Sequence, residues 1–181
     1  RRVFAEQQMS KQLGFTPATF SFNVEGGRCD ECKGEGTITV EMQFMADVTM
    51  VCESCGGQRF MPDILEVRFY GKNINDVLKM SVEEAIAFFG SKDEPASKRI
   101  AEKLQPLADV GLSYLQLGQS SSTLSGGESQ RVKLAYFLSR ESGNRPTLFI
   151  FDEPTTGLHF YDIEKLLHSF EALIDNGHSI L

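Results

Sequence analysis

The fold is decided by residues 124–157, which read LSGGESQRVKLAYFLSRESGNRPTLFIFDEPTTG. Ser125 and Glu128 form the S-x-x-E pattern of a capping box, which predicts that a helix begins here and continues to Arg140. The apolar run 148–151 follows and is typical of a short strand that is buried on both faces of a parallel sheet. A helix that leads into such a strand predicts an α/β fold.

Both ends of this stretch carry groups that suit a nucleotide. Gly126 and Gly127 let a ligand approach the backbone closely, and the start of a helix offers unpaired N–H groups to a phosphate. Asp152 and Glu153 directly follow the strand, at the edge where α/β sheets place their ligands. Adjacent carboxylates there suit a magnesium ligand and a base that orients water. The alternative is a capped helix before an ordinary core strand, which the order of these features disfavours.

These residues resemble the ABC-type ATPases. Residues 124–130 are similar to the ABC signature, 149–153 to the Walker B motif with its catalytic glutamate, and 157–159 to the D-loop. The resemblance implies ATP or ADP with Mg²⁺ as cofactors and Glu153 as the catalytic residue. It implies that the nucleotide is bound by Ser125, Gly126, Gly127, Glu128, Asp152, Gly157 and His159.

Composition is consistent with a globular domain of ordinary size. The chain has 181 residues, 41% of them hydrophobic, and no apolar run as long as a membrane span. Its 18 basic and 25 acidic residues give a net charge of −7, which argues against nonspecific nucleic-acid binding over the whole surface but allows a local basic patch. The sequence begins with Arg1 instead of Met and stops at Leu181 inside an apparent strand, so we expect it to be part of a longer protein.

All four cysteines occur in two C-x-x-C pairs, Cys29/Cys32 and Cys52/Cys55. This spacing is typical of a zinc site, and four thiolates complete a closed tetrahedral structural site. Glycines after each pair permit the tight turns that such a site needs. Alternating apolar residues within 38–44 predict a β-hairpin between the pairs. Two disulfides or redox-active thiols are the alternatives.

The rest of the chain predicts further short elements. Alternation predicts strands at 20–24 and 65–69, and helical patterns occur at 74–80 and 161–174. Another capping box, Ser81 to Glu84, begins a helix that ends at Gly90, and a helix over 96–104 is expected to end or kink at Pro106. A last strand, 178–181, completes a strand–helix–strand unit.

Nearly the whole chain resembles the second nucleotide-binding half of the UvrA family, the damage-sensing ATPases of bacterial nucleotide excision repair. The matching segments are 20–24, 26–29, 40–42, 52–55, 110–119, 124–135 and 152–160. The resemblance implies an ABC-type P-loop ATPase half with an inserted α+β zinc module at 26–60. Residues 1–110 would form the insertion, and 111–181 the ATPase part with the signature helix, Walker B and D-loop.

The family also implies how the parts work. Ser125, Gly126 and Gly127 would grip the γ-phosphate of ATP held by a partner half, while Asp152 holds Mg²⁺ through water and Glu153 polarises the attacking water. The partners implied are damaged double-stranded DNA, a second copy of the full-length protein, and a UvrB-type protein that binds through regions outside this chain. The implied location is the cytoplasm.

The sequence departs from the family in two respects. No G-x-x-x-x-G-K-[ST] motif occurs, so the Walker A strand is missing and the chain should not hydrolyse ATP alone. Leu13 and Thr19 replace arginines before the zinc module, which should weaken DNA binding. The candidate DNA contacts that remain are Lys11, Arg28 and Lys33, each of which could equally be a solvated surface charge.

Two other functions fit parts of the sequence. The departures above are compatible with a UvrA-like ABC protein in another role, such as drug resistance. The first cysteine pair with its glycines also resembles the cysteine repeat of DnaJ-type chaperones, but two pairs instead of four and the presence of residues 124–157 disfavour this reading.

Overall fold

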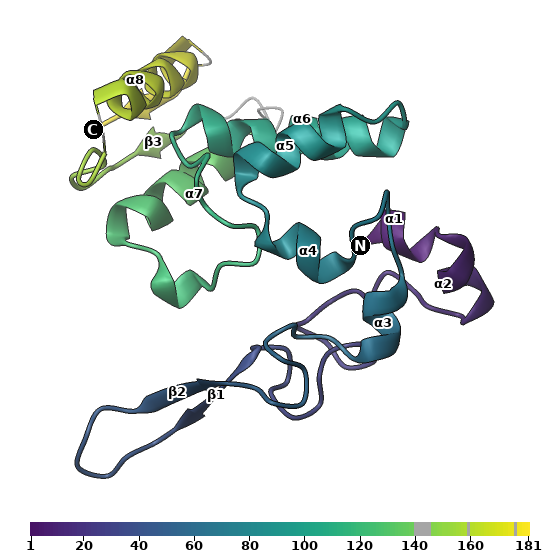
Figure 1. The fold of residues 1–181 in the computed structure, drawn as a ribbon. Coiled ribbons are helices and arrows are strands. Elements are labelled where there is room, and N and C mark those ends of the chain that lie inside the picture. Colours follow the sequence, from purple (N-terminus) through teal and green to yellow (C-terminus); the bar gives the residue numbers. More distant parts are fainter. Residues whose placement is uncertain (140–145, 159, 176) are drawn as a thin grey trace. The chain divides into compact units, whose positions relative to one another are not determined.

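The computed structural model describes residues 1–139, 146–158, 160–175 and 177–181 (Figure 1). These residues form two compact units, Arg1–Leu78 and Lys79–Leu181, which we describe separately. The division at residue 78 reflects packing within each unit. The predicted family boundary at residue 110 stays a prediction.

Unit 1 is built from short elements around an aromatic core. Its helices are α1 (Arg2–Ala5), α2 (Gln8–Gln12), α3 (Pro62–Glu66) and most of α4 (Ile74–Lys79), and its strands are β1 (Thr37–Val40) and β2 (Val48–Val51). The ring of Phe4 lies 5.5 Å from that of Phe20 and 6.2 Å from that of Phe69. These three phenylalanines and Phe60 are almost fully buried, so burial of aromatic surface holds together segments that are far apart in sequence.

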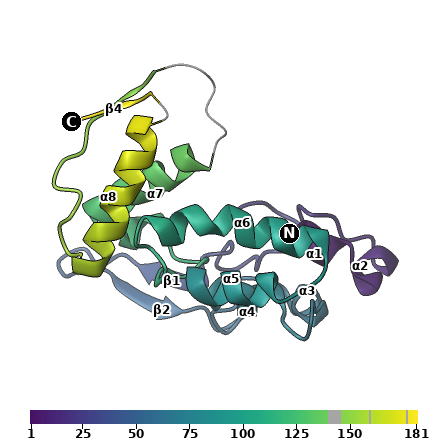
Figure 2. The same ribbon diagram turned by 90° about the horizontal axis from the view of Figure 1, so that it is seen from above.

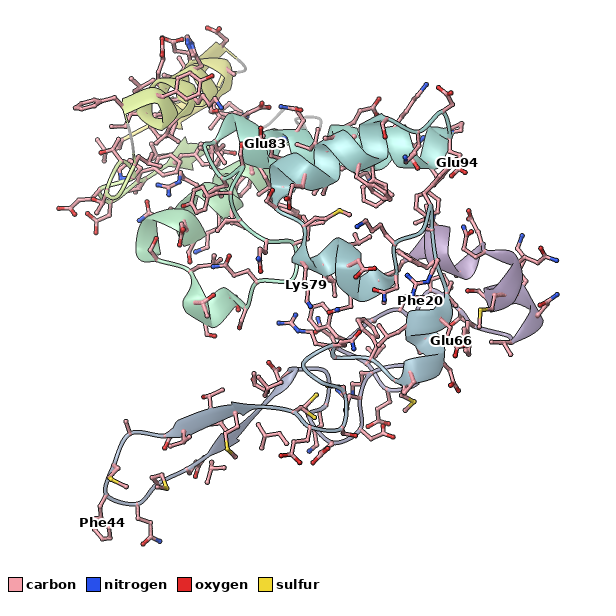
Figure 3. All side chains as sticks on the ribbon, viewed as in Figure 1. Phe20, Phe44, Glu66, Lys79, Glu83 and Glu94 are labelled. Atoms are coloured by element: carbon pink, nitrogen blue, oxygen red, sulfur yellow. The ribbon has the colours of Figure 1, made fainter. Side chains whose placement is uncertain are left out.

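The hairpin predicted between the cysteine pairs is confirmed. β1 and β2 pair antiparallel, from Thr37 opposite Val51 to Val40 opposite Val48. Both strands are exposed except at Ile38, which packs against the cysteines. At the tip, Phe44 is 96% exposed and projects away from the strands (Figure 3). The hairpin is therefore an arm whose own side chains bury little surface.

The two other strands predicted in unit 1 are wrong. Residues 20–24 form turns, in which the N–H of Ser21 donates to the carbonyl of Ala18. In place of a strand at 65–69 the chain forms α3, which begins at Pro62, a residue whose fixed φ favours the first helical turn. Val67 and Phe69 are buried, but in an irregular segment closed by a bridge from Phe69 to Lys72. Core burial of alternate residues does not require a sheet.

Unit 2 begins with two helices that pack on each other, α5 (Val82–Gly90) and α6 (Pro95–Asp109). The predicted capping box is present, since Ser81 accepts from the N–H of Glu84 and the Glu84 side chain accepts from the N–H of Ser81. The helix expected to end or kink at Pro106 does not end there, because α6 continues to Asp109. A kink at Pro106 stays a prediction.

The predicted strand–helix–strand unit is also confirmed. A 3₁₀ turn, η1 (Ser121–Thr123), leads to α7 (Gly126–Leu138), and β3 (Leu148–Phe149) is joined through α8 (Phe160–Asp175) to β4 (Ser179–Ile180). β3 and β4 lie side by side and parallel, with Leu148 opposite Ser179 and Phe149 opposite Ile180 (Figure 2). The core of the unit consists of Val82, Val110, Leu112, Leu115, Leu134, Ala135, Phe149, Leu166 and Leu173.

The segment around β3 is buried on one face, and the prediction of burial on both faces is wrong. Phe149 is 9% exposed, whereas Leu148 and Ile150 are 60% and 71% exposed. Successive side chains of a strand point to opposite faces. Phe149 therefore packs on the core of unit 2, while its two neighbours lie on the open face.

Leu166 and Leu167, adjacent on α8, give a matched test of this core. Leu166 is fully buried and Leu167 is 51% exposed. We expect Leu166→Ala to lower the free energy of unfolding by about 2–5 kcal/mol, because it removes core contacts and leaves a cavity. Leu167→Ala should cost less than about 1 kcal/mol. Urea unfolding of the chain followed by circular dichroism measures both, and equal losses would contradict this arrangement of α8.

Candidate nucleotide and metal sites

The start of α7 forms the predicted capping box. The N–H of Glu128 donates to Ser125 Oγ (3.2 Å), and the N–H of Ser125 donates to Glu128 Oε2 (2.7 Å). These two bonds fix the corner that contains Gly126 and Gly127. A Cβ at Gly126 would meet no atom within 4 Å, so the outer side of the corner is open to a ligand.

Tyr114 supports this corner from outside the predicted motif. Its hydroxyl donates to Glu128 Oε1 over 2.6 Å. That hydrogen bond is the main reason why the pKa of Glu128 is lowered, with the N–H of Ser125 as a second cause. Burial and the same carboxylate raise the pKa of Tyr114. Glu128 is thereby kept ionised, with both carboxylate oxygens occupied as acceptors.

The two acidic residues after β3 lie on a tight turn. Asp152 and Glu153 are both exposed, and Glu153 has a φ of +45°, in the left-handed region. The N–H of Thr156 donates to the Glu153 carbonyl (3.1 Å), and the Thr156 hydroxyl donates to Glu153 Oε2 (3.3 Å). The turn thus keeps the carboxylate at the surface, within reach of a ligand.

We call Ser125–Gly127 the signature corner and Asp152–Thr156 the acidic turn. Both line one hollow of about 370 Å³. The structure thereby brings together six of the predicted nucleotide-site residues. Glu128 does not line the hollow but holds its corner, and His159 lies outside the described residues. The lining residues are Ser125, Gly126, Gly127, Gln130, Asp152, Glu153, Thr156 and Gly157. This arrangement offers helix N–H groups and two carboxylates in one place, which suits a phosphate with a divalent cation.

Two residues of this site carry roles that we did not predict from the sequence. Gln130 Nε2 donates to the carbonyl of Asp152, and Arg131 Nη1 donates to the carbonyl of Pro154, both over 2.9 Å. Arg131 is 1% exposed although it carries a positive charge. The available signal was the arginine itself, which stands inside the predicted helix and directly before a largely apolar run of residues.

The four cysteines of unit 1 form a buried cluster. All four Sγ atoms lie within 4.8 Å of one another, with 3.9 Å between Cys29 and Cys52 and 3.7 Å between Cys32 and Cys55. A disulfide needs about 2.05 Å, so these thiols are not bonded to each other. Four sulfurs at about 2.3 Å from a tetrahedral zinc lie roughly 3.8 Å apart, so the cluster fits such a metal.

The thiols of the cluster differ in their pKa, and therefore in how readily they become the thiolates that bind a metal. Burial acts to raise the pKa of Cys29, but hydrogen bonds from the backbone N–H groups of Cys32 and Glu31 outweigh it and lower the pKa to about 7. Burial raises the pKa of Cys32. Because a metal binds thiolates, it must displace protons from this site, and its affinity falls as the pH is lowered.

The three basic residues predicted to contact DNA all lie in unit 1, and their role stays a prediction. Lys11 and Lys33 are exposed. The guanidinium of Arg28 lies 3.5 Å from a carboxylate oxygen of Glu25, and its side chain is 19% exposed. Arg28 would therefore exchange an existing ion pair for a phosphate, whereas the two lysines have solvated charges.

Residues 31–156, more than half of the chain, match the model of the ABC transporter family. The chain belongs to this family. Among the described residues, no helix has the length and apolar character needed to cross a membrane.

The chain is also similar to UvrA proteins over its entire length, as its sequence indicated. It is 51% identical over 181 residues to UvrABC system protein A of Clostridium perfringens and 53% identical to that of Xylella fastidiosa, covering 19% and 18% of these relatives. The crystal structure of UvrA2 from Deinococcus radiodurans superposes with a TM-score of 0.86 at 43% identity, over 98% of this chain and 21% of that one. The chain thus spans about a fifth of its relatives, and the predicted ABC fold is confirmed.

Metal binding can be tested directly at the cysteine cluster. We expect about one zinc per chain, and less than half a zinc in Cys52→Ser, because loss of one thiolate opens the tetrahedral site. Mass spectrometry of the metal content measures this, with Ser54→Ala, an exposed position inside the second pair, as the control. Less than half a zinc per wild-type chain would defeat the assignment of a closed site.

The hydrogen bond from Tyr114 predicts a specific pH dependence. Since the folded pKa of Glu128 lies below its ordinary value of 4.5, the carboxylate stabilises the fold above that value, and this contribution is lost as the pH falls through the folded pKa. Tyr114→Phe should raise the pKa of Glu128 and reduce the contribution. Carboxyl ¹³C NMR titration measures the shift. Tyr136→Phe, about two turns beyond Glu128 on α7, is the control and should leave the pKa of Glu128 unchanged. An unchanged pKa of Glu128 in Tyr114→Phe would contradict this account.

Proposed function

We propose that the full-length protein that contains this chain is a UvrA-type ATPase, which uses ATP binding and hydrolysis to recognise damaged DNA in nucleotide excision repair. The observation that carries the proposal is the shared hollow of the signature corner and the acidic turn, Ser125–Gly127 with Asp152 and Glu153. It occurs in a chain that is more than 50% identical to UvrABC system protein A throughout.

Each residue of the hollow has a role in this proposal. Bound ATP supplies the phosphoanhydride whose hydrolysis drives the protein, and Mg²⁺ supplies positive charge beside it. Ser125, Gly126 and Gly127 grip the γ-phosphate of ATP held by a partner half, through the open backbone at the start of α7. Asp152 holds Mg²⁺ through water, and Glu153 accepts a hydrogen bond from the attacking water and polarises it.

This chain is expected to be inactive by itself. It contains no G-x-x-x-x-G-K-[ST] motif, so the residues that cradle the phosphates of its own nucleotide must come from another part of the protein. Gly157 and His159 belong to the D-loop in this reading.

In this proposal, unit 1 holds the structural metal and carries the surface that contacts DNA. Zn²⁺ held by Cys29, Cys32, Cys52 and Cys55 fixes the base of the β1–β2 hairpin. Lys11, Arg28 and Lys33 are the candidate phosphate contacts. The full-length protein acts as a homodimer on double-stranded DNA and passes the lesion to a UvrB-type partner, in the cytoplasm, where bacterial DNA lies.

The repair role is tested by the preference of the full-length protein for a lesion. With ATP, we expect tighter binding to a short duplex with one bulky adduct than to the same duplex without it, measured by fluorescence anisotropy. Across a salt series both affinities should fall with similar slopes, because phosphate contacts are common to both duplexes and only the lesion-specific part differs.

The alternative role gives a different result in the same experiment. A UvrA-like ATPase that serves another purpose, such as drug resistance, would hydrolyse ATP and bind both duplexes equally. Equal affinities at every salt concentration, in a preparation with active ATPase, would therefore overturn the repair function and leave the ATPase assignment standing.

A further inference from the structure

Glu153 has a backbone conformation that costs energy. Its φ of +45° lies in the left-handed region, which brings Cβ close to the following carbonyl and costs roughly 1–2 kcal/mol for a residue with a side chain. Among the described residues of unit 2, every other residue with a positive φ is a glycine. Such a conformation persists where the surrounding structure holds it in place.

Two adjacent residues of α7 hold the backbone on either side of Glu153. Gln130 Nε2 donates to the carbonyl of Asp152, the residue before it, and Arg131 Nη1 donates to the carbonyl of Pro154, the residue after it. Both distances are 2.9 Å. The first bond restrains the peptide directly before Glu153. The second restrains the peptide one residue beyond the one that follows it, so the backbone is held on both sides of Glu153.

Arg131 is itself fixed by the core. Arg131 is 1% exposed, and Leu134 and Ala135 in the next turn of α7 belong to the core of unit 2. A buried guanidinium is costly because it has given up its hydration, and here Nη1 donates to Pro154 while Nε, also buried, has no hydrogen-bond partner among the described residues. Its burial here brings a donor under the acidic turn, which an apolar residue of similar size would not do.

Gly127 has no side chain, and this leaves room for the Arg131 guanidinium beside the acidic turn. A Cβ on Gly127 would lie 3.3 Å from Arg131 Nη1 and 3.5 Å from the carbonyl of Thr156. The first of these distances is tighter than an ordinary van der Waals contact, so the guanidinium would have to shift by a few tenths of an ångström. Gly127 thus opens the corner to ligand on one side and accommodates Arg131 on the other.

We infer that Gln130 and Arg131 are positioning residues, which hold the strained turn in the conformation that keeps the Glu153 carboxylate at the hollow. The inference deepens the proposed function and rests on the role of Glu153 in ATP hydrolysis. Neither side chain reacts in this account. They act through the carbonyls of Asp152 and Pro154, and so on the direction of the carboxylate between them.

The test uses the full-length protein and variants that keep size while removing the donors. In Gln130→Met and Arg131→Met we expect kcat for ATP hydrolysis to fall about ten- to hundredfold, the range for a misplaced catalytic group, with little change in KM for ATP. Arg131→Lys retains a donor and should recover part of the lost kcat. Matched controls are Gln105→Met and Arg99→Met, at exposed positions of α6 outside the hollow, which should keep wild-type kcat.

Thermal melting separates positioning from a loss of fold. Normal melting with reduced kcat supports the inference. Wild-type kcat in both Gln130→Met and Arg131→Met overturns it. It is also overturned if the loss of kcat follows the loss of melting temperature across all variants. If Arg131→Met does not fold, Gln130→Met and Arg131→Lys decide by the same criteria.

Glu153→Gln distinguishes failure of this inference from failure of the proposed function. We expect this variant to lose turnover by about a hundredfold or more and to retain bound ATP, because the general base is gone. Wild-type turnover in Glu153→Gln removes Glu153 from the chemistry, and with it both the proposed mechanism and the positioning role. Loss of turnover in Glu153→Gln, with wild-type kcat in the two methionine variants, overturns only the positioning role.

Discussion

The packing of α7 against the segment around β3 is the contact on which the nucleotide site depends. Leu134 and Ala135 of the helix share a core with Phe149, and the ring of Phe137 lies 5.1 Å from that of Phe149. This apolar contact fixes the helix beside the strand. The first turn of the helix and the residues that follow the strand then lie at one hollow, so that helix N–H groups and carboxylates are available to the ligand that we propose.

In unit 1 the corresponding constraint comes from the cysteines. Among the described residues, the cluster packs against one apolar side chain, that of Ile38, and the hairpin above it is almost entirely exposed. An isolated two-stranded hairpin has marginal stability in water. Bonds from one metal to Cys29, Cys32, Cys52 and Cys55 would join the two ends of the hairpin, so metal binding and folding of this arm should be one process.

The features that were predicted best from the sequence are those determined by residues close together in the chain. Both capping boxes and the C-x-x-C spacing are local patterns, and the structure shows the caps at Ser81 and Ser125 and the cysteine cluster as expected. Tertiary contacts decided the rest. Whether Leu148 is covered, or whether Phe20 packs from a strand or a turn, depends on segments distant in sequence. The bonds of Gln130 and Arg131 join residues 22 and 23 positions apart, which no local pattern specifies.

The acidic turn shows how function and stability compete within this site. Glycine at position 153 would relieve the left-handed strain at Glu153, but it would remove the carboxylate that the proposed chemistry requires. The chain keeps the carboxylate and offsets the strain with hydrogen bonds from α7, one of them from a buried arginine. Because α7 also begins with the corner that we propose to bind phosphate, a movement of that helix would displace Ser125–Gly127 and the restraints on Glu153 together. In the proposed mechanism the same helix therefore connects phosphate binding at the corner to the orientation of the Glu153 carboxylate.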